Sequence, residues 1–401
     1  MSTGAWTLPS LGGVCALVGE GLRPLFDCEI VWRGDRIVEI EGNSNGRLQD
    51  VEHIVLPSFI NAHTHIGDSL AKEAYIGLGL EEAVDPHKGL KTKIISTASK
   101  NDLVKAMRSV LEQCVSLGVT HLIDFREGGL EGLSLGREAS QGLDIDLLLL
   151  GRLATPPSKG RILENQGFTD FELEELHKVC EKGNGLGISG ANEYSDKMLT
   201  QIREIVRGQN KLLAVHCLES HETRGRLKGV LGRDEFQRCF NMLRPDVFVH
   251  MTDATPQEIS YAFNMGVVVS CPRSNAALGN GFPPLTQILN GGGGLGTDNV
   301  MVNSPDMFRE MEFAYKCLVG TTRKPFQRVE EVLKSATVNL RPRLGLKPIE
   351  VDAEADFMVL NVRELRPFWN LSSLVVNRAQ RENIEQVVRK GRKLYEKPVC
   401  V

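Results

Sequence analysis

Short apolar runs alternate with amphipathic segments from residue 54 to about residue 300, and this rhythm constrains the fold more than any other feature. Apolar runs of this length, bounded by turn residues, are typical of strands that are buried on both faces of a parallel sheet. The amphipathic segments at 103–117, 171–180, 197–206 and 257–265 predict helices that cover such a sheet. The predicted strands are 54–60, 119–125, 145–150, 186–189, 212–216, 247–250, 267–271 and 294–297. Eight strands joined by helices predict a closed (β/α)8 TIM barrel of the α/β class.

The two ends of the chain have a different rhythm, in which short strands are separated by tight turns. Residues 14–18, 28–32 and 36–40 have the apolar, β-branched character of strands. The same pattern returns late in the chain, and its predicted strands are 356–360, 384–388 and 392–395. We therefore expect residues 1–55 and 345–401 to form one small composite β-sandwich domain, and residues 56–344 to form the barrel.

Composition restricts the partners that such a chain would bind. Basic residues number 47 and acidic residues 51, and both are mixed along the chain, so no basic face is expected for nucleic acid or an anionic membrane. The longest purely aliphatic run, 147–150, is far too short to span a bilayer. We expect neither nucleic-acid nor membrane binding.

The cysteine pattern indicates a reducing compartment. The chain has nine cysteines, which is an odd number, and no two of them form a C-x-x-C pair. The N-terminal segment lacks the basic start and apolar stretch of a secretory signal peptide. We expect reduced thiols in a cytoplasmic protein.

Side chains that bind metals gather at the ends of four predicted strands. These side chains are His63, His65, His216, His250 and Asp298. The first two alternate with one residue between them, so in an extended chain both imidazoles point to the same side. The C-terminal ends of barrel strands share the face on which barrel enzymes place their chemistry. An isolated H-x-H pair is weak evidence for a metal site. Four of the nine histidines, however, lie at the ends of predicted strands, and this grouping favours a metal site over a chance arrangement.

The segments that carry these residues resemble the amidohydrolase superfamily. The segment LPSFINAHTH at 56–65 is similar to the P-G-F-I-N-x-H-T-H signature of its first strand. HCLES at 216–220 resembles the H-x-x-E-[ST] of the branch that includes chlorohydrolases and the cytosine, guanine and S-adenosylhomocysteine deaminases. CPRSN at 271–275 and GTD at 296–298 extend the match in order over nearly the whole chain. The resemblance implies a barrel with a β-sandwich built from both ends, in agreement with the strand pattern.

The resemblance also implies a mononuclear metal site. Four side chains would hold one divalent ion, namely His63, His65, His216 and Asp298. Zinc is preferred because nitrogen and oxygen ligands suit it, and iron is the alternative within the family. Binuclear relatives bridge two ions with a lysine on the fourth strand, but residues 185–191 contain no lysine. We expect no organic cofactor.

Three residues receive catalytic roles on this reading. An ion with an open position lowers the pKa of bound water to ~7, and Asp298 would accept the proton of that water. Glu219, three residues beyond a ligand, would carry protons to the ring nitrogen and to the leaving amine. His250 would orient water and substrate. The predicted reaction is the hydrolytic deamination of a small amino-substituted nitrogen heterocycle, of purine, pyrimidine or pterin type, with release of ammonia.

Two alternatives remain open at this point. The same scaffold hydrolyses cyclic amides or chloro-heterocycles, because a metal hydroxide does not itself choose the leaving group. A non-catalytic protein with the amidohydrolase fold is the second alternative. Dimers are common among such relatives, so a homodimer is compatible with the resemblance.

The sequence departs from the family in the segments that would determine substrate specificity and in the eighth strand. Ser274 and Asn275, after the seventh strand, are weaker candidates for substrate binding. The loop at 67–93 matches no named deaminase, so the substrate stays open. The glycines at 291–294 stand where the family has an apolar eighth strand, which makes this strand about two residues short unless the backbone approaches a neighbour closely.

Overall fold

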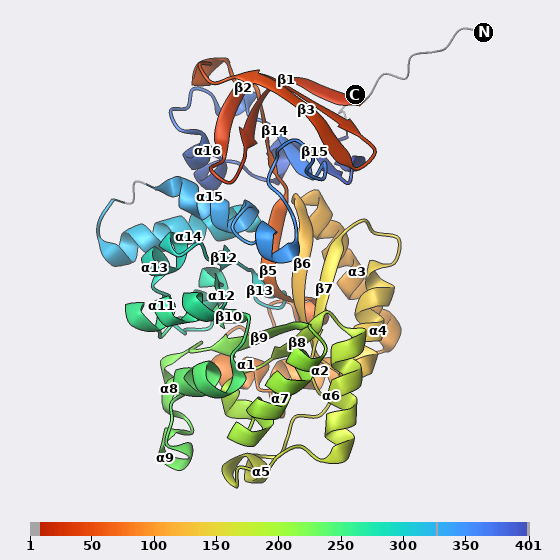
Figure 1. Cartoon of the computed structure of the whole chain (residues 1–401), viewed down its shortest axis with the longest axis vertical. Helices are drawn as coiled ribbons and strands as arrows, with labels where there is room; N and C mark the ends of the chain where they lie inside the picture. The colour runs from red at the N-terminus through yellow and green to blue at the C-terminus, as the bar shows by residue number, and fades with distance from the viewer. Residues whose placement is uncertain (1–8, 326–327, 399–401) are drawn as a thin grey trace, which may run out of the picture.

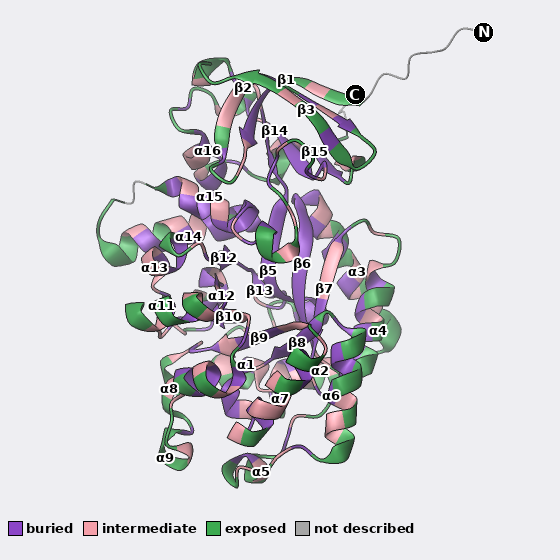
Figure 2. Ribbon diagram, viewed as in Figure 1, coloured by how far each residue is buried: buried purple, intermediate pink, exposed green. Residues whose placement is uncertain are grey.

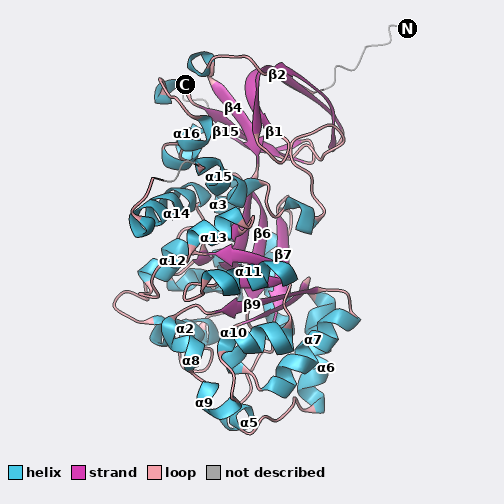
Figure 3. Cartoon of the chain, turned by 60° about the vertical axis from the view of Figure 1, so that its left-hand side comes forward, coloured by secondary structure: helices cyan, strands magenta, loops and turns pink. Residues whose placement is uncertain are grey.

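The computed structural model describes residues 9–325 and 328–398. Two sheets organise this part of the chain, a small sheet at one end of the molecule and a parallel sheet at its centre (Figure 1). Helices surround the central sheet (Figure 3). None of the helices in the described ranges is both long and apolar enough to cross a membrane.

The central sheet is a closed parallel barrel. Its strands are β5 (Phe59–His65), β6 (Val119–Arg126), β7 (Asp146–Gly151), β8 (Gly185–Ile188), β9 (Leu212–Cys217), β10 (Val247–His250), β11 (Val267–Ser270), β12 (Gly294–Leu295) and β13 (Asp298–Asn299). They follow one another in chain order from β5 to β12, and every pairing among them is parallel. The last two are short parts of one eighth strand, because β12 pairs with β11 whereas β13 pairs with β5. This arrangement confirms the predicted (β/α)8 barrel.

The glycines of the eighth strand allow its backbone to press against β5. A Cβ atom on Gly296 would lie 2.7 Å from the backbone nitrogen of His63 and 2.8 Å from its Cβ. A Cβ atom on Gly294 would lie 2.5 Å from a methyl carbon of Leu340. The eighth strand is indeed short, and the close backbone approach explains why it is rich in glycine.

Helices connect the strands, and the longer ones cover the outer face of the barrel. They are α1 (Leu80–Val84), α2 (Leu90–Thr97), α3 (Lys100–Ser116), α4 (Gly129–Ser140), α5 (Lys159–Leu163), α6 (Asp170–Lys182), α7 (Asp196–Gly208), α8 (His221–Gly225), α9 (Lys228–Leu231), α10 (Glu235–Arg238), α11 (Pro256–Met265), α12 (Pro272–Ala277), α13 (Leu285–Asn290), α14 (Met307–Thr322), α15 (Val329–Thr337) and α16 (Leu371–Asn377). The four long helices predicted from amphipathicity begin one to three residues earlier than expected, because a Ser or Thr hydroxyl caps each of them. The strands inside are largely buried, and every residue of β5 and β6 is buried (Figure 2).

The small sheet combines both ends of the chain, as predicted. Its strands, in spatial order, are β16 (Arg392–Glu396), β15 (Ile384–Arg389), β14 (Phe357–Asn361), β4 (His53–Pro57), β1 (Ser10–Val18), β2 (Arg23–Arg33) and β3 (Arg36–Asn43). The sheet has its own apolar core, in which the rings of Trp32 on β2 and Phe357 on β14 pack edge to face at 5.6 Å. The proposed domain boundaries at 55/56 and 344/345 stay a prediction.

One predicted strand, 54–60, was wrong. Its first part is β4 of the small sheet, and its second part begins β5 of the barrel. The break falls at Ser58, whose hydroxyl donates a 2.5 Å hydrogen bond to Asp356, while Arg341 pairs with Asp356 at 3.0 Å. Both sheets bury this run, so its apolar character cannot show that it changes sheet.

Candidate functional site

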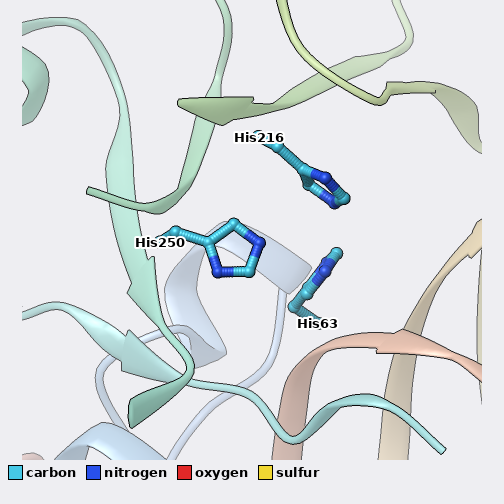
Figure 4. A group of neighbouring side chains, drawn as sticks. All are labelled: His63, His216 and His250. Atoms are coloured by element: carbon cyan, nitrogen blue, oxygen red, sulfur yellow. The ribbon is translucent and has the colours of Figure 1, made fainter. Parts of the chain in front are cut away.

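Four histidines meet at the C-terminal ends of the barrel strands. His63 and His65 lie on β5, His216 lies on β9, and His250 ends β10. The ring centroids of His63 lie 4.9 Å from those of both His65 and His216, and the His216 and His250 rings are also 4.9 Å apart. In Figure 4 the rings of His63, His216 and His250 converge on one point from three strands. The structure therefore brings all four predicted histidines together.

Asp298 joins this group from the eighth strand. Its Oδ1 lies 3.1 Å from His63 Nε2 and 3.5 Å from His65 Nε2. Burial raises the pKa of Asp298, but the hydrogen bond from His63 and the surrounding imidazoles hold that pKa well below its usual value. Asp298 and His250 both have left-handed backbones, with φ of 62° and 74°. Such conformations are uncommon outside glycine and gather at functional sites.

The donor set fits a divalent metal ion. Within residues 9–325 and 328–398, the site holds three buried imidazole nitrogens without a hydrogen-bond partner, namely His63 Nδ1, His216 Nε2 and His250 Nε2. Buried polar atoms are normally paired, so this number of orphans in one place calls for a ligand. The potential ligand atoms of each of three overlapping sets lie within 4.8 Å of one another, and the sets are His63/His216/His250, His63/His65/Asp298 and Glu219/His250/Asp298. Imidazole nitrogens with a carboxylate are the ligands of catalytic zinc sites.

Glu219 lies beside this centre, immediately after β9. Its Oε2 is 3.7 Å from His250 Nε2 and 3.8 Å from His216 Nδ1. Burial raises the pKa of Glu219, so its environment opposes that of Asp298. Two carboxyl groups whose pKa values are pushed apart are typical of an acid and a base in one active site. The amide of Leu218 donates a 3.0 Å hydrogen bond to the buried Glu235, and this contact holds the turn that carries Glu219.

Ser274 and Asn275, the weaker candidates for substrate binding, lie on α12 and contact Asp298 and His250. Ser274 Oγ donates a 2.5 Å hydrogen bond to Asp298 Oδ2. His250 Nδ1 donates a 3.0 Å hydrogen bond to Asn275 Oδ1. Both side chains are buried on α12. These contacts support a positioning role, and a contact with substrate stays a prediction.

On the other side of His65 lies a cluster of charged residues to which the sequence alone assigned no role. Glu127 Oε1 lies 3.1 Å from His65 Nδ1 and 2.5 Å from Lys91 Nζ. Burial raises the pKa of Glu127, but Lys91 and Arg126 hold it well below its usual value. Burial also lowers the pKa of His65 to about 3, so this ring is neutral, as a metal ligand must be. Glu127 follows β6 at the catalytic face, which was a usable signal, whereas nothing in the sequence around Lys91 indicates that this lysine is buried.

Two adjoining cavities reach the site. The first has about 90 Å³ and is lined by His65, His216 and Glu219 together with Arg152. The second has about 380 Å³ and extends from Glu127 and Arg152 between α2, α3 and α4. A small molecule can thus reach the edge of the histidine cluster from the mouth of the barrel.

Comparisons with known proteins identify relatives of the whole arrangement. The model of the amidohydrolase family matches residues 54–394. A protein named as an aminohydrolase from Methanothermobacter thermautotrophicus is 33% identical over 360 residues, which cover 89% of this chain and 90% of the relative. A 5-methylthioadenosine/S-adenosylhomocysteine deaminase from Pyrococcus horikoshii is 25% identical over 395 residues, with coverage of 91% and 89%.

The fold is also shared with solved structures. Atrazine chlorohydrolase from Arthrobacter aurescens TC1, in complex with zinc, superimposes with a TM-score of 0.80 over 96% of this chain and 95% of that chain, at 17% identity. This likeness concerns the fold, whereas the family match and the 33% identical relative concern the sequence itself. On this evidence the chain belongs to the amidohydrolase family.

Proposed function

We propose that this protein is a mononuclear metal-dependent hydrolase that deaminates an amino-substituted nitrogen heterocycle of purine, pyrimidine or pterin type and releases ammonia. The observation that carries the proposal is the position of Glu219, whose carboxyl group lies within 4 Å of two imidazoles of the cluster and lines the small cavity. The deaminase relative at 25% identity supports the same class of substrate.

One divalent ion would be held by His63, His65, His216 and Asp298. Such an ion makes water acidic enough to act as a nucleophile near neutral pH. Zinc is the ion we propose, because the donors are imidazoles and a carboxylate and because the chlorohydrolase with the same fold was solved with zinc. A single ion is proposed because β8 (Gly185–Ile188) supplies no lysine to bridge a second one.

The protein residues divide the proton transfers between them. Asp298, whose pKa is low, is ionised at neutral pH and accepts the proton of the attacking water. Glu219, whose pKa is raised, holds a proton closer to neutral pH and delivers protons to the ring nitrogen and the departing amine. His250 directs Nε2 toward the site because Asn275 engages its Nδ1, and it orients water and substrate. The water oxygen bonds to the ring carbon, and the exocyclic carbon–nitrogen bond breaks. The two protons of the water restore those that Glu219 delivers, so that the oxo product and ammonia leave with Asp298 and Glu219 in their original states.

The leaving group separates this reaction from its alternatives. An amine leaves only after it has been protonated, whereas chloride leaves without a proton. Protonation of the ring nitrogen by Glu219 would assist both reactions, so detection of released ammonia or chloride distinguishes them. Cyclic-amide hydrolysis stays an alternative that product analysis would detect. A non-catalytic protein would have no use for Glu219 beside the histidines.

We also propose a cytoplasmic location and a small heterocyclic substrate, with neither nucleic acid nor a membrane as a partner, and we propose a homodimer as the assembly to test. The cysteines that the structure describes are free and buried, which is compatible with a reducing compartment; Cys400 lies outside the described residues. Gel filtration with light scattering would test the dimer.

The decisive experiment measures ammonia release by zinc-loaded protein across aminopurines, aminopyrimidines and aminopterins. Glu219→Gln should lower turnover of any active compound at least ~100-fold, because general acid–base catalysis typically contributes 10²–10⁴-fold. Zinc content should not change in that variant. Glu204→Gln, at an exposed position of α7, is the matched control. Near-normal turnover by Glu219→Gln would remove Glu219 from the mechanism.

A further inference from the structure

The cavity beside the histidine cluster is too small to hold a whole substrate. Its volume of about 90 Å³ lies below the ~300–1,000 Å³ usual for ligand pockets, whereas the adjoining cavity of about 380 Å³ lies within that range. The two cavities share five lining residues, namely Val84, Pro86, Lys91, Arg152 and Ser189. A ligand whose reacting ring occupies the small cavity would therefore extend past these residues into the large one.

The boundary between the two cavities is rich in cations. Lys91, Arg126 and Arg152 all approach the single carboxylate of Glu127. Lys91 is only 4% exposed and Arg126 only 3%. Lysine and arginine are seldom buried to this extent unless they are paired, so Lys91 and Arg126 require partners besides the carboxylate that they share with Arg152.

Arg126 and Lys91 each lie near a second buried carboxylate, whereas the contacts of Arg152 are of another kind. Asp124 lies 3.3 Å from Arg126, and Asp68 lies 3.4 Å from Lys91. The contacts of Arg152 within the described residues are a 2.5 Å hydrogen bond to Ser189 Oγ and a 3.4 Å approach to Glu127. A guanidinium has five N–H donors, so Arg152 keeps donors for a ligand in the cavities that it lines.

The large cavity beyond this boundary has an apolar wall. Leu103 and Met107 of α3, Leu135 of α4, Leu153 and Tyr194 contribute to it. This wall suits the carbon skeleton of a substituent, and the cations at the entrance suit an acidic group on it. A guanidinium binds carboxylate or phosphate through paired hydrogen bonds.

We propose that the large cavity binds a substituent of the heterocycle that carries a carboxylate or phosphate, and that Arg152 binds this anion. The inference rests on the proposed function, because the reacting ring is placed in the small cavity. It makes Arg152 a determinant of specificity. The alternative is that these cations only neutralise Glu127, and this alternative predicts no preference for charged substrates.

The test compares pairs of compounds that share a ring and differ in an anion. Pterin and pterin-6-carboxylate form one pair, and adenosine and adenosine 5′-monophosphate form the other, so the pairs distinguish carboxylate from phosphate. We expect a higher kcat/KM for the anionic member of at least one pair. Arg152→Gln should lower that kcat/KM by about 10- to 100-fold, mainly through KM, since a hydrogen bond to a charged group is worth that much.

Controls separate recognition from structural damage. Arg137→Gln, exposed on the outer side of α4, should keep the preference. Arg152→Lys should restore part of it. Equal losses for both members of a pair in Arg152→Gln, or a neutral member that is the better substrate, would overturn the proposal.

Binding measurements keep this inference distinct from the proposed function. Calorimetry with pterin-6-carboxylate and adenosine 5′-monophosphate needs no turnover. If no compound released ammonia but the wild type bound an anionic member more tightly and Arg152→Gln did not, the binding site would stand and the deaminase proposal would fail. Turnover of both members at equal kcat/KM would leave the deaminase and remove the anion site.

Discussion

Replacing Gly296 by alanine should damage the metal site through the backbone alone. The new Cβ would lie 2.7 Å from the nitrogen of His63 and 2.8 Å from its Cβ and carbonyl oxygen, roughly 0.6 Å short of ordinary van der Waals contact. These atoms belong to a buried strand and have no flexible side chain to move. The eighth strand must therefore shift away from β5, and Asp298, two residues further on, shifts with it.

The size of the effect follows from these contacts. Overpacking a rigid core typically lowers the free energy of unfolding by ~1–3 kcal/mol. The loss of alignment between Asp298 and His63 should lower zinc affinity by ~10–100-fold, as seen when the groups that orient metal ligands are removed. The assay is competition for zinc with a chromophoric chelator, followed by chemical unfolding of the metal-free protein.

A matched glycine provides the control. Gly320 lies on the exposed side of α14, and no atom lies within 4 Å of the Cβ position there. Gly320→Ala should raise the free energy of unfolding by ~0.5–1 kcal/mol and leave zinc affinity unchanged. A Gly296→Ala protein that binds zinc as tightly as the wild type would refute the explanation of the glycine-rich eighth strand.

Two further predictions concern buried carboxylates. Glu127→Gln should weaken zinc binding by ~10–100-fold in the chelator assay, because Glu127 orients His65; unchanged affinity would assign Glu127 to charge balance alone. Asp356→Asn should lower the free energy of unfolding by ~3–5 kcal/mol at pH 7, because Arg341 stays buried without its partner. Burial raises the pKa of Asp356, but Arg341 and His121 lower it further, so its stabilisation is complete above its unfolded pKa of ~4 and is lost as the pH falls through the lower folded value. The free energy of unfolding of the wild type should thus decrease below about pH 4, and the Asn variant should lack this part of the acid dependence.

The barrel was predictable because its strands are buried on both faces and its helices on one. That difference leaves a signal in every βα unit, whereas the strand assignment of residues 54–57 failed, and residues 67–93, which we expected to be a loop, contain α1 and the start of α2. Residues 54–57 are as apolar as those of β5, and the sheet that buries them is chosen by pairing with β14 and β1. Pairing partners distant in sequence leave no local pattern.

The ligand candidates were predictable for a related reason. His63, His65, His216 and Asp298 are polar residues at the ends of apolar runs, where a core cannot accept them without a partner. Lys91 could not be found in this way. It lies on the short helix α2, and it is buried only because that helix folds across the mouth of the barrel onto Glu127.

The backbone conformations of His250 and Asp298 constrain the site in addition to the contacts of their side chains. Left-handed conformations cost about 1–2 kcal/mol for residues with a Cβ, and both His250 and Asp298 adopt them. Each is held by one side chain of α12, Asn275 for His250 and Ser274 for Asp298. Because the two holding residues are adjacent on a single turn, a displacement of α12 would release both strained residues together. Substitutions at Ser274 and Asn275 are therefore expected to be non-additive, since each already disturbs the turn on which the other depends.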